Sequence, residues 1–343
     1  MLIMRNSANN YLTKQALQTK ATQLLPILTA AFLDLHYKEI THQRISHQDT
    51  SYQDIGFQGL TKARHSQFGQ VMIKWEISAN IYYDLTHLGH EIKVLQALNG
   101  SQCKTQPTIN IAPQVLIDKS SMIKILNKNY QLSFLVMPYY PLGSLAQYLK
   151  QALSIEQKHQ LITQAAYLIS HLHKQGWLHN DIKPSNFLIS TFLSDIELAN
   201  KSATITLTHS LLLTDFALAQ RINSVKNENN QPAGTPAYLA PECWQGKRPT
   251  QQSDSYAFGI MVYEILTGDR PFKRAKISDE PFNDWAIQHC QQSIPKLPNQ
   301  YQDYQLIVDK SLAKKAENRY KDMTEVIADL YQCSDYKPLS FKG

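Results

Sequence analysis

The chain has 343 residues, of which 43% are hydrophobic and 18% are charged, so it can bury a large core as one domain or as two lobes. Its formal net charge of +6 is mild for this length, and no basic stripe interleaved with aromatic residues stands out. We therefore expect no nucleic-acid partner. The modest basic excess suits a protein that handles a polyanion, without demonstrating it.

Neither cysteine usage nor hydropathy suggests secretion. The four cysteines are scattered without a CxxC pair, which argues against a structural zinc site or a disulfide framework and is compatible with a reducing cytosol. The N-terminus becomes polar too early for a signal peptide, and the apolar stretch at 24–35 contains Pro26 and Asp34 and is too short to span a bilayer. We expect a cytoplasmic protein without a membrane span.

The first third of the chain predicts one helix and then a sheet. Residues 11–35 place apolar side chains at helical spacing with an interruption near Pro26, and residues 36–50 are polar and expected to be irregular. From Ser51 onward, short strand-like runs predict a small, mostly antiparallel sheet with one helix over 86–98. The strand-like runs are 50–57, 59–65, 69–77, 114–118 and 131–140.

After Pro141 the pattern becomes mainly helical. Ser154 and Gln157 have the form of a capping box that opens a long amphipathic helix. Further helical patterns occur at 252–267, 280–293, 302–313 and 322–332. The sequence therefore predicts an α+β protein with a small sheet-rich lobe followed by a larger helical lobe, and ligands often bind in the cleft between such lobes.

A polar loop at 177–188 carries the first candidate catalytic residues. Asp181, Lys183 and Asn186 lie within six positions on a segment that Pro184 prevents from being helical. Here a carboxylate can accept a hydroxyl proton, an ammonium can neutralise a phosphoryl oxygen, and an amide can bind a divalent cation. A plain polar turn after a helix explains the same residues about equally well.

Two further carboxylates and a lysine add to this set. Asp215 follows a run suited to a buried strand, where its oxygens could bind magnesium or simply cap a helix. Strand alternation puts Lys74 on the same face as Met72, and a lysine on an inward face needs a partner. Glu91 on the following helix is the natural candidate, although either residue alone is more often a solvated surface charge.

Taken in order and spacing, these pieces resemble the signature set of the protein kinases, from about Ser51 to about Tyr336. One such motif would be weak support, but seven in the same order are strong support. The matching features are VMIK (71–74), Glu91, HNDIKPSN (179–186), TDFA (214–217), GTPAYLAPE (234–242), SDSYAFGIMVYEILTGDRPF (253–272) and ENRY (317–320).

The resemblance implies a role for each matching residue. Lys74, fixed by Glu91, would hold the α- and β-phosphates of ATP, and Asn186 and Asp215 would bind Mg²⁺. Asp181 would orient and deprotonate the acceptor hydroxyl, while Lys183 would steady the γ-phosphate. The remaining implied residues are Gly56 and Gly59 in a glycine-rich phosphate loop, Met137, Pro138 and Tyr140 around the adenine, and the structural residues His179, Glu242, Asp254 and Arg319.

The resemblance also implies a bilobal kinase fold and a function. We expect an N-terminal extension over 1–50, a small lobe over 51–138, a large lobe over 139–336 and a C-terminal tail over 337–343. Lys183 two positions after Asp181 is similar to the serine/threonine class, and Thr235 fits the same assignment. The expected activity is ATP- and Mg²⁺-dependent phosphorylation of serine or threonine on protein substrates.

The sequence also departs from the kinase pattern, and two alternatives stay open. Only two glycines occupy the candidate loop at 55–60, Ala217 replaces a glycine, and Asn180 replaces an arginine whose usual partner is a phosphorylated loop. The loop and Ala217 support the alternative of a pseudokinase that binds nucleotide or acts as a scaffold, whereas the retained Asp181 opposes it. Asn180 makes activation by phosphorylation of the loop less expected. A small-molecule kinase is disfavoured by Glu242 and Arg319. Residues 190–209 are expected to extend a hairpin of unassigned function.

Overall fold

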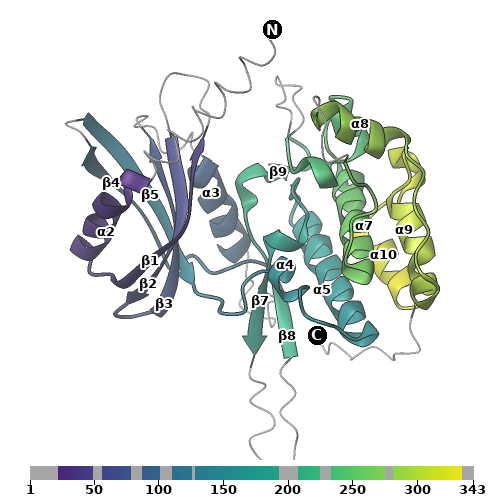
Figure 1. Cartoon of the computed structure of the whole chain (residues 1–343), viewed down its shortest axis with the longest axis horizontal. Helices are drawn as coiled ribbons and strands as arrows, with labels where there is room; N and C mark the ends of the chain where they lie inside the picture. The colour runs from purple at the N-terminus through teal and green to yellow at the C-terminus, as the bar shows by residue number, and fades with distance from the viewer. Residues whose placement is uncertain are drawn as a thin grey trace, which may run out of the picture. The chain divides into compact units, whose positions relative to one another are not determined.

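The computed structural model describes residues 22–48, 56–78, 87–100, 110–125, 128–192, 208–224, 233–274 and 281–333. The chain divides into a small unit, Met1–Gly100 with Pro113–Tyr139, and a large unit, Ser101–Ala112 with Tyr140–Gly343. Each unit is described by itself (Figure 1). The small unit is sheet-rich and the large unit is mainly helical, which confirms the expected α+β, bilobal kinase-like class.

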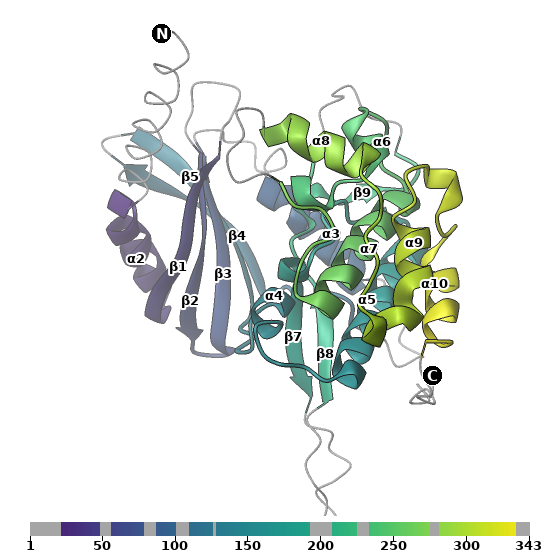
Figure 2. The ribbon, with the colours of Figure 1, turned by 45° about the vertical axis from the view of Figure 1, so that its right-hand side comes forward.

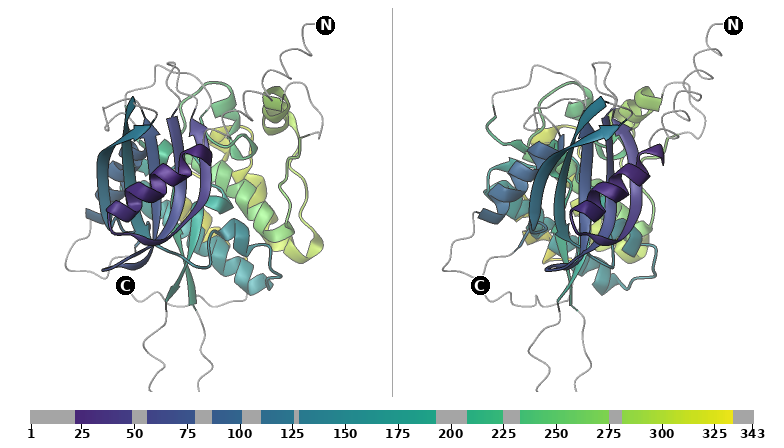
Figure 3. Two further views of the ribbon diagram at one scale, coloured as in Figure 1. Left: turned by 60° about the vertical axis from the view of Figure 1, so that its left-hand side comes forward. Right: turned by 90° about the vertical axis from the view of Figure 1, so that its left-hand side faces the viewer.

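The small unit is a five-stranded antiparallel sheet in the order β1-β2-β3-β5-β4. One helix covers each face: α2 lies across one face in Figure 3, and α3 lies on the other. Helix α3 matches the helix expected over 86–98. The elements of this unit are α2 Leu25–Asp34, β1 Lys38–Gln48, β2 Gly56–His65, β3 Gly69–Ser78, α3 His87–Gly100, β4 Ile117–Ile125 and β5 Lys128–Pro138.

Alternation along β3 separates the two faces of the sheet. Odd-numbered residues from Val71 to Ile77 are buried in a core that also contains Leu28 and Phe32 of α2. The even-numbered side chains point to the opposite face, where the Leu88 N–H at the start of α3 donates to Glu76 Oε2 at 3.2 Å. This period of two places Lys74 on the α3 face, as the sequence predicted.

The irregular structure expected for residues 36–50 is wrong, because Lys38–Gln48 forms strand β1. This strand lies at the edge of the sheet and pairs only with β2, so it needs few apolar side chains to be held in place. Its Ile40 and Ile45 are the partly buried residues that join the core beneath α2. The helix and strand that precede residue 50 are therefore integral to the small unit, and the expected boundary at residue 50 falls after β1.

The glycine-rich loop expected over 55–60 is also wrong. Residues 56–60 belong to strand β2 and pair with β3, while Ile55 lies outside the described residues. Gly59 faces Trp75 across the strands, and an added Cβ there would overlap the Trp75 indole and the Arg44 carbonyl oxygen. The packing of Trp75 therefore explains the glycine at position 59.

The large unit is built around helices α5 and α7. Helix α5 packs against α7 and α10, and α7 packs against α9 (Figure 2). The capping box at the start of α5 is confirmed, since Ser154 Oγ accepts from the Gln157 N–H at 3.2 Å and Gln157 Oε1 accepts from the Ser154 N–H at 2.9 Å. The helices are α4 Leu145–Tyr148, α5 Ile155–Lys174, α6 Pro241–Trp244, α7 Gln251–Thr267, α8 Pro281–Gln291, α9 Gln305–Ser311 and α10 Met323–Leu330.

Most of the expected helices of this unit are found. The patterns at 252–267, 280–293 and 322–332 correspond to α7, α8 and α10. The pattern at 302–313 is divided instead, because a 3-10 helix at Asn299–Tyr304 with a non-helical Tyr301 precedes α9. No helix among the described residues is both long enough and apolar enough to cross a membrane.

Two short antiparallel strand pairs complete the large unit. Strand β6 (Trp177–Leu178) pairs with β9 (Gln220–Arg221), and β7 (Phe187–Phe192) pairs with β8 (Thr208–Leu213). The second pair is the hairpin expected near 190–209, although residues 193–207 lie outside the described part of the chain. Its register, with Phe187 opposite Leu213, brings the residues just before β7 and just after β8 to one end of the hairpin.

Replacing Gly59 by alanine tests this packing. We expect Gly59→Ala to destabilise the small unit by about 1–3 kcal/mol, because the new methyl group must displace Trp75 or the β1 backbone. Chemical denaturation of both proteins measures the difference. The matched control is Gly100→Ala at the end of α3, where no atom lies within 4 Å of an added Cβ and where no destabilisation is expected. Equal unfolding free energies for Gly59→Ala and the wild type would contradict this assignment.

Candidate active site

In the small unit the structure joins Lys74 to Glu91. Lys74 Nζ on β3 lies 2.5 Å from Glu91 Oε2 on α3, and Glu91 is only 1% exposed. A carboxylate buried to this degree is stable when a cation and hydrogen bonds compensate it. Because Lys74 is about one-fifth exposed, its ammonium can also contact a ligand. This is the pair that strand alternation predicted.

The three expected adenine-binding residues lie at the end of β5 and just beyond it. Met137 is buried and faces Met72 of β3, and Pro138, the last residue of β5, faces Val71. The next residue, Tyr139, uses its N–H to bond the Gln70 carbonyl at 3.2 Å. Burial raises the pKa of Tyr140 to about 12, so its phenol is neutral at physiological pH.

In the large unit, both carboxylate oxygens of Asp181 accept hydrogen bonds. Its Oδ2 accepts from Lys183 Nζ at 2.5 Å and from Asn186 Nδ2 at 2.9 Å. Its Oδ1 accepts from the hydroxyl and the backbone N–H of Thr235, at 2.7 and 3.1 Å. The structure therefore brings together the three residues predicted from the 177–188 loop, and it orients both carboxylate oxygens of Asp181.

Thr235 is a site residue whose contacts the sequence did not reveal. We used it only to favour a serine/threonine class, but its Oγ1 also accepts from Lys183 Nζ at 2.6 Å. The side chain thus links the catalytic loop to a segment more than fifty residues further along the chain. Its place in the GTPAY motif was the only signal in the sequence.

Asn186 and Asp215 lie at the same end of the β7–β8 hairpin. The Thr214 N–H donates to the Asn186 carbonyl at 3.0 Å, next to Asp215. Asn186 Nδ2 is used by the carbonyl and the carboxylate of Asp181, so the amide oxygen faces away from them. An amide oxygen and a carboxylate are hard ligands that suit Mg²⁺, which also takes phosphate oxygens and water. The described ranges hold no cluster of three or more His, Cys, Asp or Glu that could enclose a metal without such additional ligands.

His179 links the 177–188 loop to the segment after β8 through hydrogen bonds. Its buried ring donates from Nε2 to the Thr214 carbonyl at 3.1 Å and accepts at Nδ1 from the Asp181 N–H at 3.3 Å. This pattern requires the neutral ring, and burial lowers the pKa of His179 in the same sense. The imidazole also packs beside Phe216, with ring centroids 5.1 Å apart. His179 therefore connects Asp181 to the segment that carries Asp215.

Asp254, at the start of α7, holds the backbone of the catalytic loop. Its carboxylate accepts the N–H groups of His179 and Asn180 and the Nε2 of His173, each at 2.9 Å. Burial raises the pKa of Asp254, but these hydrogen bonds outweigh burial and the net pKa is lowered. His173 was missed by sequence reasoning, because a single histidine beside the apolar stripe of α5 carries no distinctive spacing.

Glu242 and Arg319 form the expected pair. The guanidinium donates from both terminal nitrogens to the two Glu242 oxygens at 2.8 and 2.7 Å, and Ser253 Oγ donates to the same carboxylate at 2.7 Å. Burial raises the pKa of Glu242, but the bonds to Arg319 prevail and lower it overall. Together they tie the end of the GTPAYLAPE segment to helix α7 and to the turn that precedes Tyr320.

The backbone accommodates both departures from the kinase pattern, Ala217 and Asn180, and Ala217 is not strained. The residue with the left-handed backbone is Asp215, with φ 65°, and not Ala217. Ala217 lies within the 3-10 turn Phe216–Leu218. Asn180 also has a positive φ of 64°, which asparagine tolerates, and its Nδ2 donates to the Leu218 carbonyl at 2.8 Å. In place of an arginine, Asn180 thus ties the catalytic loop to the segment after Asp215.

A small sheet-rich unit in which a lysine pairs with a buried glutamate, and a helical unit with this arrangement of carboxylates, define the architecture of a kinase domain. Comparison with protein families agrees, because residues 83–332 match the protein kinase domain. The chain therefore belongs to the protein kinase family.

Similar curated proteins carry serine/threonine kinase names. The chain is 31% identical over 204 residues to a probable serine/threonine-protein kinase PknB of Lactococcus lactis, which covers 57% of this chain and 29% of that protein. It is 32% identical over 190 residues to serine/threonine-protein kinase PknB of Mycobacterium leprae, which covers 53% of this chain and 27% of that protein. A probable serine/threonine-protein kinase gdt4 of Dictyostelium discoideum is 34% identical over 142 residues, 40% of this chain and 8% of that protein. The chain thus spans less than a third of the length of these relatives.

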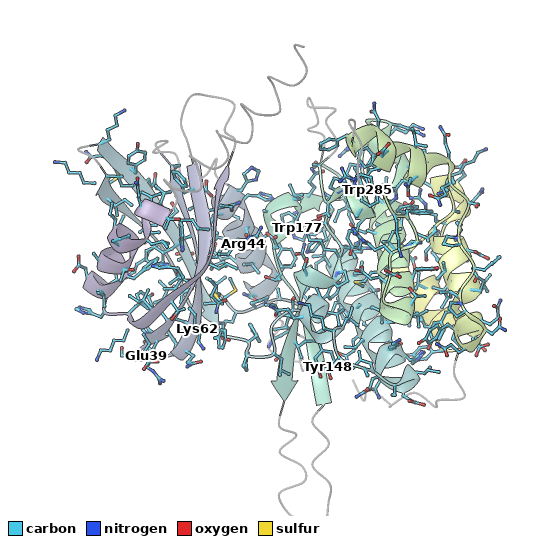
Figure 4. All side chains as sticks on the ribbon, in the orientation of Figure 1. Glu39, Arg44, Lys62, Tyr148, Trp177 and Trp285 are labelled. Atoms are coloured by element: carbon cyan, nitrogen blue, oxygen red, sulfur yellow. The ribbon has the colours of Figure 1, made fainter. Side chains whose placement is uncertain are left out.

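Removing Arg319 tests the contribution of the buried pair. We expect Arg319→Gln to lower the unfolding free energy by about 3–5 kcal/mol, because the Glu242 carboxylate then stays buried without its cation. Thermal or urea unfolding measures the loss. The matched control is Arg221→Gln, which removes an exposed arginine that lies over the Trp177 ring (labelled in Figure 4) and should change stability much less. Similar losses in both variants would show that the buried pair has no special role.

Proposed function

We propose that this chain is an ATP-dependent protein kinase that transfers the γ-phosphate of ATP to serine or threonine hydroxyls of protein substrates. The observation that carries this proposal is the Asp181 carboxylate held by Lys183, Asn186 and Thr235. A carboxylate whose oxygens are oriented in this way can receive a proton from a substrate hydroxyl.

The proposed reaction follows from these groups. The acceptor hydroxyl gives its proton to Asp181 while its oxygen bonds to the γ-phosphorus. The bond between that phosphorus and the β–γ bridging oxygen breaks, and ADP leaves with the bonding electrons. Lys183, which lies 2.5 Å from Asp181, offsets the negative charge on the transferring group. Positioning and electrostatics therefore account for most of the catalysis that these residues can supply.

The kinase resemblance assigns nucleotide-binding roles to residues of each unit taken separately. Lys74, fixed by Glu91, holds the α- and β-phosphates, and Met137, the Pro138 carbonyl and the Tyr140 N–H contact the adenine. Asn186 and Asp215 would hold Mg²⁺ through oxygen ligands, and the ion would supply positive charge that neutralises the phosphates. The two hard oxygens at the end of the β7–β8 hairpin support this assignment.

Serine and threonine are the proposed acceptors for two reasons. Lys183 follows Asp181 by two residues and contacts both Asp181 and Thr235. The relatives that the chain resembles over about half of its length are named as serine/threonine kinases. Membership of the kinase family makes proteins the expected class of substrate.

The second candidate function is a pseudokinase, and one observation favours it. Gly56 and Gly59 lie in strand β2, and residues 49–55, which connect β1 to β2, include no glycine. A connection without glycine has less freedom to bring its backbone amides close to phosphates. A chain with a weak phosphate grip could bind nucleotide without useful turnover and act as a scaffold.

Phosphate transfer from Mg²⁺-ATP to generic proteins, measured with Asp181→Ala and Asp215→Asn, distinguishes the two candidates. We expect the wild type to label serine or threonine, and we expect both variants to lose activity by at least about a hundredfold. Asp269→Asn, at an exposed ion pair with Lys273, is the matched control and should keep full activity. A folded wild type that binds ATP but labels no protein would favour the pseudokinase.

Thr235 provides a second test of the site geometry. We expect Thr235→Val to reduce phosphate transfer about ten- to a hundredfold, because it removes the hydroxyl that contacts Asp181 and Lys183. Thr235→Ser keeps a hydroxyl and should keep most of the activity. Steady-state rates of the three proteins with one acceptor protein decide the question, and equal loss in both variants would mean that the hydroxyl is not what matters.

A further inference from the structure

A chain of hydrogen bonds crosses the small unit from strand β3 to helix α2. Trp75 Nε1 donates to Thr61 Oγ1 at 2.9 Å, and Thr61 Oγ1 lies 2.8 Å from His42 Nδ1. The other ring nitrogen, His42 Nε2, lies 2.9 Å from Thr29 Oγ1 on α2. Four side chains from β3, β2, β1 and α2 are therefore linked in sequence, one from each element.

The direction of each bond follows from its neighbours. Thr29 Oγ1 gives its proton to the Leu25 carbonyl at 2.9 Å, so it must accept from His42 Nε2. His42 Nδ1 is then free of a proton and accepts from the Thr61 hydroxyl, whose oxygen accepts from Trp75. With these directions His42 is neutral and carries its proton on Nε2, and the hydroxyl protons of Thr29 and Thr61 both have an acceptor.

The chain is the polar part of an otherwise apolar interface. Leu28 and Phe32 of α2 are wholly buried in the same core as Trp75, and the Phe32 ring packs edge-on against Phe134 of β5 at 5.8 Å. Thr61 is 0% exposed and faces His42 directly across the β1–β2 pair. Gly59 leaves the space that the Trp75 indole occupies above β2.

The printed contacts of the His42 ring are all with uncharged groups, namely the hydroxyls of Thr29 and Thr61 and the Leu25 carbonyl. On β2, Lys62 lies over the Tyr139 ring and Arg64 pairs with Glu39 of β1. Figure 4 labels Lys62 and Glu39 near one end of the sheet. Helix α2 contributes only Thr29 and the Leu25 carbonyl. Burial lowers the pKa of His42 and the Leu25 carbonyl raises it, and burial prevails.

We infer that this chain of hydrogen bonds is a pH-sensitive contact between α2 and the sheet. Neutral His42 holds α2 on the sheet, and protonated His42 releases it. A proton on Nδ1 would turn the acceptor of the Thr61 hydroxyl into a second donor. The Thr61 proton would then have no acceptor at a position without solvent, which is costly. Strand β3, to which α2 is linked through these hydrogen bonds, also carries Lys74 next to Trp75. The inference concerns the small unit and does not depend on the proposed function.

The sign of the pH dependence follows from linkage. Because the pKa of His42 is lower in the folded unit than its ordinary 6.5, the released state binds more protons. The stabilisation of the α2–sheet contact by neutral His42 is fully present above pH 6.5 and is lost as the pH falls from 6.5 toward the lowered pKa of His42. One proton changes the equilibrium by at most about tenfold per pH unit.

Hydrogen exchange of the α2 peptide in the full-length protein tests whether α2 is released when His42 is protonated. Wild type and His42→Gln are compared at pH 7.5, 6.5 and 5.5, always at the same pH, which removes the intrinsic pH dependence of exchange. Glutamine can donate to Thr29 without titrating, so its α2 should stay protected while wild-type α2 loses protection several-fold at pH 5.5. Equal protection of α2 in both proteins at pH 5.5 would overturn the inference.

Two further variants keep the test decisive if His42→Gln folds poorly. Thr29→Val removes the acceptor on α2 together with its bond to the Leu25 carbonyl, and it should lower α2 protection at pH 7.5 while β3 keeps its protection. His65 lies on β2 but takes no part in these hydrogen bonds, and it stacks on Phe68 instead. His65→Gln should therefore behave like the wild type at every pH. Unchanged α2 protection in Thr29→Val at pH 7.5 would also overturn the inference.

Discussion

The candidate site of the large unit depends on one buried carboxylate. Asp254 accepts the backbone N–H groups of His179 and Asn180, and a buried carboxylate needs such donors to remain ionised. These two bonds hold Asn180 in its left-handed conformation, and that conformation turns the chain so that Asp181 faces Asn186 and Thr235. Without this anchor, a loop rich in polar residues would have many alternative conformations of similar free energy.

The supports of Asp254 come from several parts of the chain. His173 of α5 donates to it, and the neighbouring Ser253 donates to Glu242, which is paired with Arg319. Each member is buried and satisfies another, so loss of one member leaves a polar group without a partner in a poorly solvated place. Such a network fixes the orientation of the candidate site residues, and electrostatic catalysis depends on groups that are oriented in advance.

The small unit follows a different principle. Its sheet is covered on both faces, by α3 through the Lys74–Glu91 pair and by α2 through apolar packing. Because successive residues of β3 face opposite sides, Lys74 and Trp75 respond to different helices although they are adjacent. Helix α2 is thus structurally joined to the strand that carries Lys74.

Local signals in the sequence were enough for most helices, for the strand with Lys74, and for the order of the kinase motifs. They failed for β1, because an edge strand can be polar and still be held by backbone pairing, and for Gly59, because its need for space comes from Trp75 sixteen residues later. Residue type and spacing by themselves determined the groups to which the proposed chemistry is assigned. Only the tertiary structure decided that Thr235 reaches Asp181, that His173 supports Asp254, and that α2 covers the sheet, since these contacts join residues far apart in the chain and leave no local pattern.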